Sequence, residues 1–350
     1  MSPRDASRAN VPRRPTIRDV ARHAGVSLGT VSNVLNRPEI VAPETLVRVR
    51  AAIEASGFVR SSAARQLRDG SSRTIGVVIL DVSNPFFTEL VRGVESTVVE
   101  EGYVVVLCST DESAQREQRY LRLLEEHRVD GILATPVESD TGLFAALAQR
   151  GLPVVLLDRP VPDRSLCSVT VDDARGGELA AAHLFALGHQ KIALVNGPTS
   201  IRQCADRRRG VRRAARRARR DPDEAVLEFR VPTLTAESGE EAVARLLAGL
   251  AGASAVVCAN DLLALGVLKG FAGAGVRVPD DVSLVGYDDV AFSAMLSPSL
   301  TSVRQPTTDL GATAARLLLD ELAGDHHEHR KVVFSPQLAV RASTAPPARR

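Results

Sequence analysis

The chain has 350 residues, of which 44% are apolar and 25% charged, a composition typical of a globular protein long enough for two or three domains. Its net charge of +2 is unevenly placed, because residues 1–73 hold 13 arginines and no lysine against 6 acidic residues. A basic N-terminal module on a mildly acidic body predicts a polyanion as the partner of that module.

Two further features exclude classes of protein. No apolar run comes near the roughly 18 residues of a membrane span, and no apolar signal segment opens the chain, so we predict a cytoplasmic protein without a membrane partner. The four cysteines form no C-x-x-C pair, which argues against a metal site or a disulfide framework and favours buried reduced thiols.

Residues 16–35 follow a polar, arginine-rich stretch (1–15) that we predict to be a disordered tail, and they have the pattern of two short helices joined by a tight turn. Apolar residues recur at i, i+3, i+4 and i+7 over 17–24, Gly25 suits the end of the first helix, and Ser27 can cap the second. This is the layout of a helix-turn-helix, although an ordinary antiparallel helix pair has the same pattern.

Two segments after this pair support the DNA-binding interpretation. A third helix is predicted over 43–56, ending at Gly57, and its apolar residues can close a three-helix core. Residues 60–69 (RSSAARQLRD) could form a short arginine-rich helix that folds on DNA and inserts Leu67 as a minor-groove wedge; a simple linker is the alternative.

The run TIRDVARHAGVSLGTVSNVLNRPEIVAPETLVRVRAAIEASGF, followed by AARQLR and TIGVVILDVSNPFF, resembles the LacI/GalR family of bacterial transcriptional repressors, and the resemblance extends from about Thr16 to Arg341. It implies a helix-turn-helix headpiece, a hinge helix and a two-lobed effector-binding core related to periplasmic sugar-binding proteins. It also implies a homodimer that binds palindromic operator DNA. The hinge entry Phe58-Val59-Arg60 departs from the family, which usually has Tyr-x-Pro there, and we expect the missing proline to weaken preorganisation of the hinge helix.

The expected DNA contacts combine this resemblance with the exposed face of the second helix. By matching motif positions, the resemblance implies that Leu28, Gly29 and Asn33 read bases, and an asparagine amide suits adenine. The full set of expected DNA-binding residues is Thr16, Ser27, Leu28, Gly29, Thr30, Ser32, Asn33, Asn36, Arg60, Ala64 and Leu67.

From residue 74 onward, short β-branched apolar runs alternate with helical segments, which predicts parallel sheets with crossover helices. Two series of such runs predict an α/β core of two doubly wound lobes, of the periplasmic-binding-protein type that the resemblance implies. The predicted strands are 74–80, 104–108, 131–135 and 153–158 in the first lobe, and 168–171, 191–196, 226–231, 255–259 and 282–286 in the second.

The C-terminal quarter is predicted to return to the first lobe. Residues 300–306 are interpreted as the strand that crosses back, helix 307–323 as part of lobe one, and strands 331–334 and 338–341 as part of lobe two. The predicted domains are a tail (1–15), a headpiece (16–58), a hinge (59–72), a core (73–342, with lobe one at 73–165 and 303–325 and lobe two at 166–300 and 328–342) and a disordered tail (343–350).

Doubly wound sheets bind ligands beyond the carboxyl ends of their strands, and here those ends carry carboxylates, amides and one arginine. Planar polar groups suit vicinal hydroxyls, so the pattern favours a sugar-like effector. Where purine-responsive members of the family carry Arg and Thr ligands, this chain has Ile201 and Gln203, which also favours a sugar over a purine. The expected effector-binding residues are Asn84, Phe86, Phe87, Asp111, Asp158, Arg207, Asn260, Asp288 and Gln305.

Two charged stretches have a competing interpretation. Residues 207–220 hold nine arginines, which we interpret as a solvated helix face and not as a second nucleic-acid surface. Residues 326–329 (HHEH) resemble a small metal-binding tract, but no partner ligand is close in sequence, so an exposed polar loop is favoured.

No P-loop, G-x-G-x-x-G, G-x-S-x-G or H-E-x-x-H motif occurs, so the sequence predicts no enzyme, no cofactor and no metal. The function predicted is a dimeric transcriptional repressor of carbohydrate genes, switched by a sugar-like effector between the lobes. The alternative is a cytosolic sugar-binding or sugar-processing protein whose N-terminal helices serve protein interaction.

Overall fold

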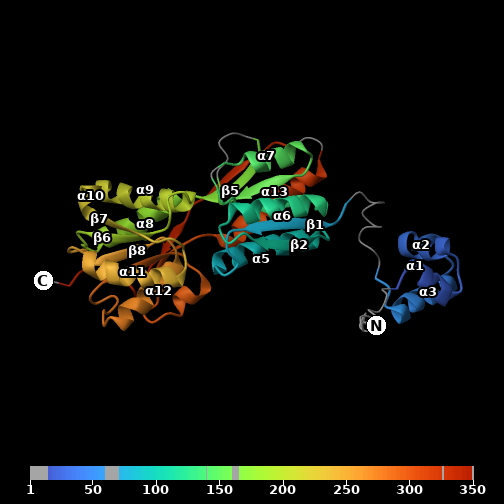
Figure 1. The fold of residues 1–350 in the computed structure, drawn as a ribbon, viewed down its shortest axis with the longest axis horizontal. Coiled ribbons are helices and arrows are strands. Elements are labelled where there is room, and N and C mark those ends of the chain that lie inside the picture. Colours follow the sequence, from blue (N-terminus) through green and yellow to red (C-terminus); the bar gives the residue numbers. More distant parts are fainter. Residues whose placement is uncertain (1–14, 60–70, 139, 160–164, 325–326, 349–350) are drawn as a thin grey trace, which may run out of the picture. The chain divides into compact units, whose positions relative to one another are not determined.

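The computed structural model describes residues 15–59, 71–138, 140–159, 165–324 and 327–348 (Figure 1). The chain divides into two compact units, residues 1–72 and residues 73–350, which are described separately below. The predicted N-terminal tail and most of the predicted hinge, including Arg60, Ala64 and Leu67, lie outside the described residues. None of the helices in the described ranges is long and apolar enough to cross a membrane.

Within its described residues, 15–59 and 71–72, the first unit has three helices that pack through one small core, as predicted. They are α1 (Ile17–Ala24), α2 (Leu28–Asn36) and α3 (Pro43–Ser56), with a 3-10 turn at Pro38–Ile40 between the last two. Val20, Val31 and Val49, one from each helix, are fully buried against one another. Gly25 and Gly57 end α1 and α3 with φ of 62° and 63°, the left-handed region in which a Cβ is unfavourable.

The second unit, here called the core, contains two six-stranded sheets that define its two lobes. The sheet of lobe one is parallel throughout, in the order β11-β5-β4-β3-β1-β2. Its strands are β1 (Thr74–Ile79), β2 (Val104–Ser109), β3 (Gly131–Ala134), β4 (Val154–Leu157), β5 (Cys167–Val171) and β11 (Lys331–Phe334).

Helices cover both faces of this first sheet. One face packs against α5 (Pro85–Glu100) and α13 (Thr307–Ala323), and the other against α6 (Ala114–Glu126) and α7 (Gly142–Gln149). Burial on both faces explains why the four inner strands, β1, β3, β4 and β5, appear in the sequence as largely apolar runs without alternation.

The sheet of lobe two has the order β12-β10-β9-β8-β6-β7, with only the β10–β12 pair antiparallel. Its strands are β6 (Ile192–Asn196), β7 (Val226–Arg230), β8 (Ala255–Cys258), β9 (Ser283–Asp288), β10 (Thr301–Arg304) and β12 (Gln337–Ala339). One face packs against α8 (Asp173–Ala186) and α9 (Arg202–Arg217), and the other against α11 (Ala236–Gly249) and α12 (Asp261–Gly273). The short α10 (Pro222–Ala225) precedes β7, and a 3-10 turn at Ala291–Ala294 follows β9.

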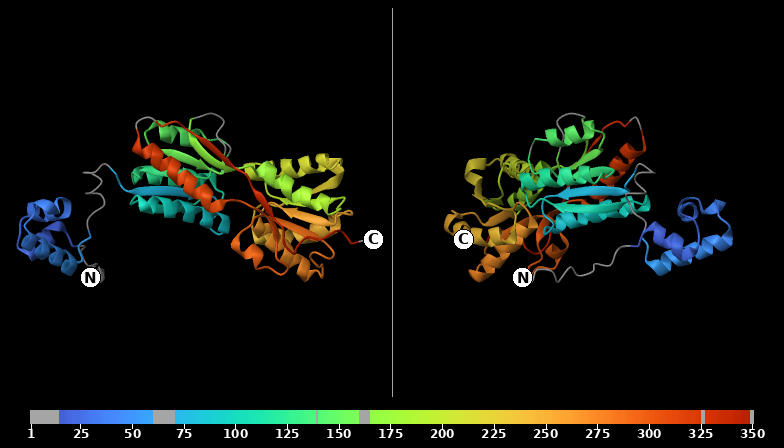
Figure 2. Two further views of the ribbon diagram at one scale, coloured as in Figure 1. Left: turned by 180° about the vertical axis from the view of Figure 1, so that it is seen from behind. Right: turned by 45° about the vertical axis from the view of Figure 1, so that its right-hand side comes forward.

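The chain passes between the lobes three times: after β5, after β10 and after β11 (Figure 2). The predicted fold class is therefore confirmed, but two strands were assigned to the wrong lobe: residues 168–171 and 331–334 lie in lobe one. The crossing strand at 301–304 pairs in lobe two, so the predicted start of the returning lobe-one segment at residue 303 falls inside this strand. The strands of both lobes are equally apolar, so their sequences do not indicate which sheet they join.

The predicted disorder after residue 342 is also wrong for the described residues. The backbone N–H of Leu284 donates to the carbonyl of Ser343 at 2.8 Å, and the Ser343 hydroxyl lies 2.8 Å from the N–H of Thr301. Ser343 is only 1% exposed. The segment therefore continues the hydrogen bonding at the edge of lobe two.

Candidate functional site

Helix α2 presents a small, weakly charged surface to solvent. The Ser27 hydroxyl accepts from the N–H of Thr30 at 3.0 Å, so the predicted N-cap is present and fixes the start of the helix. Leu28 is 44% exposed, and Gly29 and Asn33 are also exposed. These are the three positions that the resemblance implies as base-reading.

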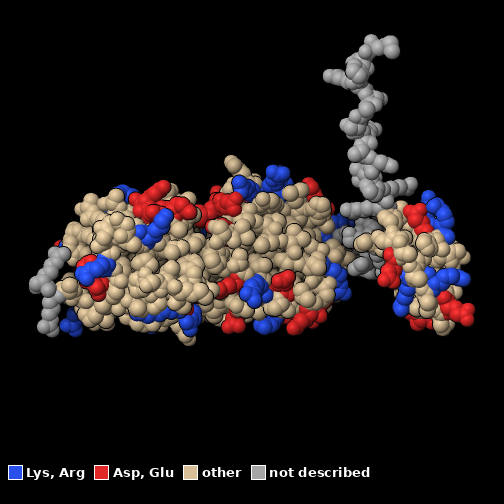
Figure 3. Space-filling model, turned by 90° about the horizontal axis from the view of Figure 1, so that it is seen from below, with Lys and Arg blue, Asp and Glu red and all other residues tan. Residues whose placement is uncertain are grey.

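The other predicted headpiece contacts have roles within the fold. Thr16 and Asp19 form a capping box, with the Thr16 N–H donating to the carboxylate at 2.8 Å. Asn36 donates to the Ser32 hydroxyl at 3.1 Å, and both are half-buried, as is Thr30. The arginines at 18, 22, 37, 48 and 50 are all exposed, and basic side chains lie among a few acidic ones on the headpiece face seen in Figure 3.

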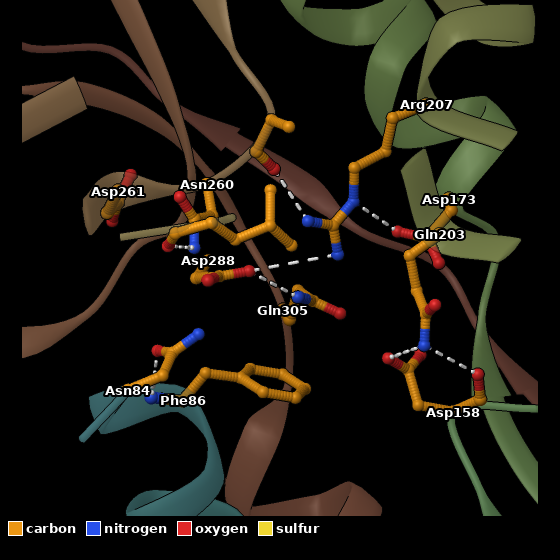
Figure 4. Close-up of polar contacts among 12 residues, drawn as sticks. Asn84, Phe86, Asp158, Asp173, Gln203, Arg207, Asn260, Asp261, Asp288 and Gln305 are labelled. Carbon is orange, nitrogen blue, oxygen red and sulfur yellow. Dashed lines mark hydrogen bonds and ion pairs between the residues drawn. The ribbon is translucent and has the colours of Figure 1, made fainter. Parts of the chain in front are cut away.

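In the core, the interlobe cluster consists of Asp158, Asp173, Gln203, Arg207, Asp288 and Gln305 (Figure 4). All six are buried, with exposed fractions between 4% and 6%. They come from the carboxyl ends of β4 and β9, from the starts of α8 and α9, and from the segment between β10 and α13. This is the edge of the sheets at which α/β folds bind ligands.

Arg207 is the centre of this cluster. Its Nε donates to Asp173 at 2.8 Å, Nη1 donates to the Ala259 carbonyl at 2.6 Å, and Nη2 lies 3.8 Å from an Asp288 oxygen. The guanidinium carbon stands 3.7 Å from the centroid of the Tyr287 ring. Although burial opposes the charge, the surrounding carboxylates, Asp173 foremost, hold the pKa of Arg207 well above its usual value.

Close packing of α8 on α9 sets the position of Arg207. A Cβ on Gly177 would lie 2.1 Å from the Arg207 carbonyl oxygen, and one on Gly210 would lie 2.0 Å from the Ala174 carbonyl oxygen. Glycine at both positions lets the helix backbones approach, and this approach brings the start of α9 to the cleft.

Two hydrogen-bonded pairs complete the cluster. Gln305 Nε2 donates to Asp288 at 2.8 Å, and Gln203 Nε2 donates to the Asp158 carboxylate at 2.7 Å and to its carbonyl at 3.0 Å. Since β4 belongs to lobe one and α9 to lobe two, the second pair joins the lobes directly. Burial, and after it the negative Asp173, raises the pKa of Asp158 to about 7; burial also raises the pKa of Asp288 well above its usual value.

Two buried acceptors of the cluster have no hydrogen-bond partner among the described residues: Asp158 Oδ1 and Gln305 Oε1. The second polar atom of each side chain forms a hydrogen bond, Asp158 Oδ2 with Gln203 and Gln305 Nε2 with Asp288. These bonds fix the orientation of both side chains and leave the two acceptors available to a ligand. Buried acceptors are normally satisfied, and a bound molecule with hydroxyl or amine hydrogens would satisfy both.

The remaining predicted effector residues are Asn84, Phe86 and Phe87 at the start of α5, Asn260 before α12, and Asp111 before α6. Phe86 and Phe87 form an edge-to-face pair at 5.1 Å, and Asn84 caps α5 by accepting from the Phe86 N–H. Figure 4 shows Asn84 and Phe86 facing the space below Gln305. Asn260 caps α12 and donates to the Leu234 carbonyl at 3.0 Å, so both ends of its amide are used within the fold.

Asp111 lies outside the cluster. It is exposed and forms an ion pair with Arg116 at the start of α6. A cavity of about 490 Å³ lies nearby, at the mouth between the lobes, lined by Leu80, Glu112, Ala114, Val137, Glu138, Pro198, Ser200 and Ile201. A larger cavity of about 710 Å³ lies on lobe one beside α13 and β11, away from the carboxyl ends of the strands.

Sequence reasoning missed Asp173 and the role of Tyr287, and it considered Gln203 only as a departure from a purine site. A signal for Asp173 was present, because it lies two residues after a buried strand and begins a helix. The stacking of Tyr287 on Arg207 had no such signal, since the two residues come from different elements.

Arginines of α9 form ion pairs with acidic residues of the same lobe. Arg208 pairs with Glu228 at 2.8 Å, Arg212 pairs with Asp223 at 2.6 Å, and two further arginines pair with the buried Glu178. These pairs fit the predicted solvated helix face better than a second nucleic-acid surface.

Comparison with known proteins decides the family. Residues 16–61 match the family "Bacterial regulatory proteins, lacI family", and residues 181–344 match "Periplasmic binding protein-like domain". The chain is 36% identical over 333 residues to the HTH-type transcriptional repressor PurR of Photobacterium profundum, which spans 94% of this chain and 98% of that protein. The chain belongs to the LacI family.

Solved structures of LacI-family proteins agree with the observed fold. The lac repressor dimer bound to operator and the anti-inducer ONPF has a TM-score of 0.82 and 28% identity, and covers 95% of this chain and 100% of that one. The CelR–cellobiose complex has a TM-score of 0.71 and 34% identity, and covers 94% and 100%. This LacI-family chain is thus a DNA-binding transcriptional repressor with an effector-binding core.

Proposed function

We propose that this repressor responds to a small polyhydroxylated effector of the sugar class, bound at the interlobe cluster. The supporting observation is the pair of buried acceptors on Asp158 and Gln305 that have no partner in the described part of the chain, beside the fixed charge of Arg207. Oriented acceptors on two sides of a site suit a ligand rich in hydroxyl donors. We further propose that the protein acts in the cytoplasm and is not an enzyme.

A purine is the competing class of effector. Of the two positions that depart from the purine-responsive pattern, Ile201 contributes an apolar wall to the 490 Å³ cavity, and the Gln203 amide already donates to Asp158. Neither Ile201 nor Gln203 supplies a cationic hydrogen-bond donor, and this supports a sugar over a purine as the effector.

The effector class is tested by titrating monosaccharides, disaccharides and purines into the full chain by calorimetry. A sugar is expected to bind, and Asp158→Asn is expected to weaken it by about 1–3 kcal/mol, because one charged acceptor is lost. Asp309→Asn, an exposed carboxylate on α13, is the matched control and should bind like the parent. Tight binding of a purine with no response to any sugar would overturn the proposal.

For the DNA site, we propose that Leu28, Gly29 and Asn33 read bases and that exposed arginines contact phosphates. Asn33→Ala is expected to weaken operator binding by about 1–3 kcal/mol in a gel-shift assay, since a bidentate amide contact is lost. Glu54→Gln on the exposed side of α3 is the control. Unchanged affinity in Asn33→Ala would refute this reading. Leu67 as the minor-groove wedge stays a prediction from the resemblance.

A second copy of the chain is the proposed protein partner, on a palindromic operator. Strand β2 is the last strand of its sheet and exposes Val104 (60%) and Val106 (42%), with Val99 of α5 also exposed at 54%. An apolar sheet edge is normally covered. Val104→Lys should therefore convert a dimer to a monomer in light scattering. A dimer that survives this change would argue against the β2 edge as the dimer interface.

A further inference from the structure

A second group of chemically active side chains lies in lobe one, away from the interlobe cluster. Cys167 begins β5, Glu321 lies near the end of α13, and His327 and His329 lie in the segment that joins α13 to β11. One possible ligand atom of each residue lies within 4.8 Å of every other. The sequence interpretation that the histidine tract has no possible partner ligands nearby is therefore wrong: Glu321 lies six positions before His327, and the fold brings Cys167, 160 positions away, beside both.

The distances within this group match those of a tetrahedral metal site. Cys167 Sγ lies 3.0 Å from His327 Nε2 and 3.8 Å from His329 Nδ1. Zn–S of about 2.3 Å and Zn–N of about 2.0–2.1 Å place sulfur and nitrogen about 3.6 Å apart in a tetrahedron. The observed separations lie on either side of this value, so small side-chain rotations would allow a metal ion to bind.

The surroundings also fit a bound cation. Cys167 is fully buried, and its sulfur accepts from the backbone N–H of Arg330 at 3.3 Å, an outer contact that would orient a thiolate ligand. Glu321 Oε2 is buried and has no hydrogen-bond partner among the described residues. The ring centroids of the two histidines lie 5.4 Å apart at 69°, and one nitrogen of each ring lies within 4.8 Å of the Cys167 sulfur and of a Glu321 oxygen.

We propose that Cys167, Glu321, His327 and His329 bind one Zn²⁺ ion. A thiolate, two neutral imidazoles and a carboxylate neutralise the charge of a divalent ion, and this soft, mixed donor set favours zinc over magnesium or calcium. With four protein ligands the site is closed, so its role is structural. The ion would fasten the end of α13 and the following segment to β5.

A cysteine binds zinc as the thiolate, so zinc binding at this group would release the proton of Cys167. The competing interpretation is a hydrogen-bonded thiol–imidazole contact that binds no metal.

The test measures zinc alone on the full chain after removal of metals with a chelator. Elemental analysis and calorimetry should give one Zn²⁺ per chain, and Co²⁺ should give tetrahedral d–d bands together with a thiolate charge-transfer band. Cys167→Ser and His329→Gln should each weaken zinc binding by more than the roughly 10–100-fold that loss of an outer contact costs. Cys108→Ser and His127→Gln are the matched controls and should bind zinc like the parent.

His329→Gln keeps the test decisive if Cys167→Ser fails to fold, because His329 is half-buried in a connecting segment. Zinc should raise the melting temperature of the parent and of both controls but not of His329→Gln. Substoichiometric binding, Co²⁺ spectra without the thiolate band, or equal zinc affinity in parent and variants would each overturn the proposal.

Discussion

Asp158 carries the most distinctive chemistry of any single residue in the interlobe cluster. Its side chain is buried and accepts a hydrogen bond from Gln203 across the lobes, and its other oxygen has no partner among the residues that the structure describes. Burial and the nearby Asp173 raise its pKa to about 7, against the opposing effect of Arg207. Near neutral pH the residue therefore changes between a charged carboxylate acceptor and a neutral carboxylic acid.

The raised pKa of Asp158 predicts that effector affinity depends on pH. A ligand hydroxyl that donates to Asp158 prefers the carboxylate, so affinity should rise with pH by at most about tenfold per unit below the pKa and level off above it. Calorimetry at about pH 6, 7 and 8 measures the slope. Asp158→Asn should flatten it, while Asp288, whose pKa is also raised, stays in both proteins as an internal control. An identical slope in Asp158→Asn would assign the titration to another group.

At the scale of elements, the pairing of α8 with α9 determines where Arg207 stands. The two helices approach through Gly177 and Gly210, each facing a backbone carbonyl of the other helix. Backbone atoms cannot move aside as flexible side chains do, so the contact distance is fixed by the absence of a Cβ. The position of Arg207 in the interlobe cluster therefore depends on two glycines that lie outside that cluster.

Gly177→Ala is accordingly expected to destabilise the core by about 1–3 kcal/mol and to weaken effector binding, because α9 must move to admit the methyl group. Chemical denaturation and calorimetry measure the two effects. Gly273→Ala near the end of α12 is the matched control: a Cβ there meets nothing within 4 Å, so it should be neutral or slightly stabilising. Equal stability of the two variants would contradict the packing argument.

The elements also show how far sequence alone reaches. Apolar runs and caps correctly predicted the headpiece helices and most strands of both sheets, because those signals are local. The lobe membership of 168–171 and 331–334 was not predictable, since the sequence of a short apolar strand does not indicate which sheet it joins. In the site, Asp158, Arg207 and Asp288 follow from their place at strand or helix ends. Cys167 and His327 are 160 positions apart, and only the fold brings them together.

At the scale of the whole molecule, function requires that the effector site and the DNA-binding headpiece influence each other. The chain crosses between the lobes three times, and the Gln203–Asp158 bond adds a contact that depends on how the lobes are placed. A ligand that replaces this bond with its own hydrogen bonds changes the relative stability of the lobe arrangements. Its effect on operator affinity is limited by its difference in affinity for those arrangements.

Thermodynamic linkage gives a quantitative prediction for the coupling between effector binding and operator binding. The factor by which saturating effector changes operator affinity must equal the factor by which saturating operator changes effector affinity, and factors of about 5–150 are typical. Fluorescence anisotropy with labelled operator measures the first factor, and calorimetry with and without operator measures the second. Asp158→Asn should retain effector-free operator affinity while requiring more effector for the same change. Two unequal factors would mean that a further equilibrium, such as dimer dissociation, is coupled to DNA binding, and repeating both measurements at higher protein concentration would bring the factors together in that case.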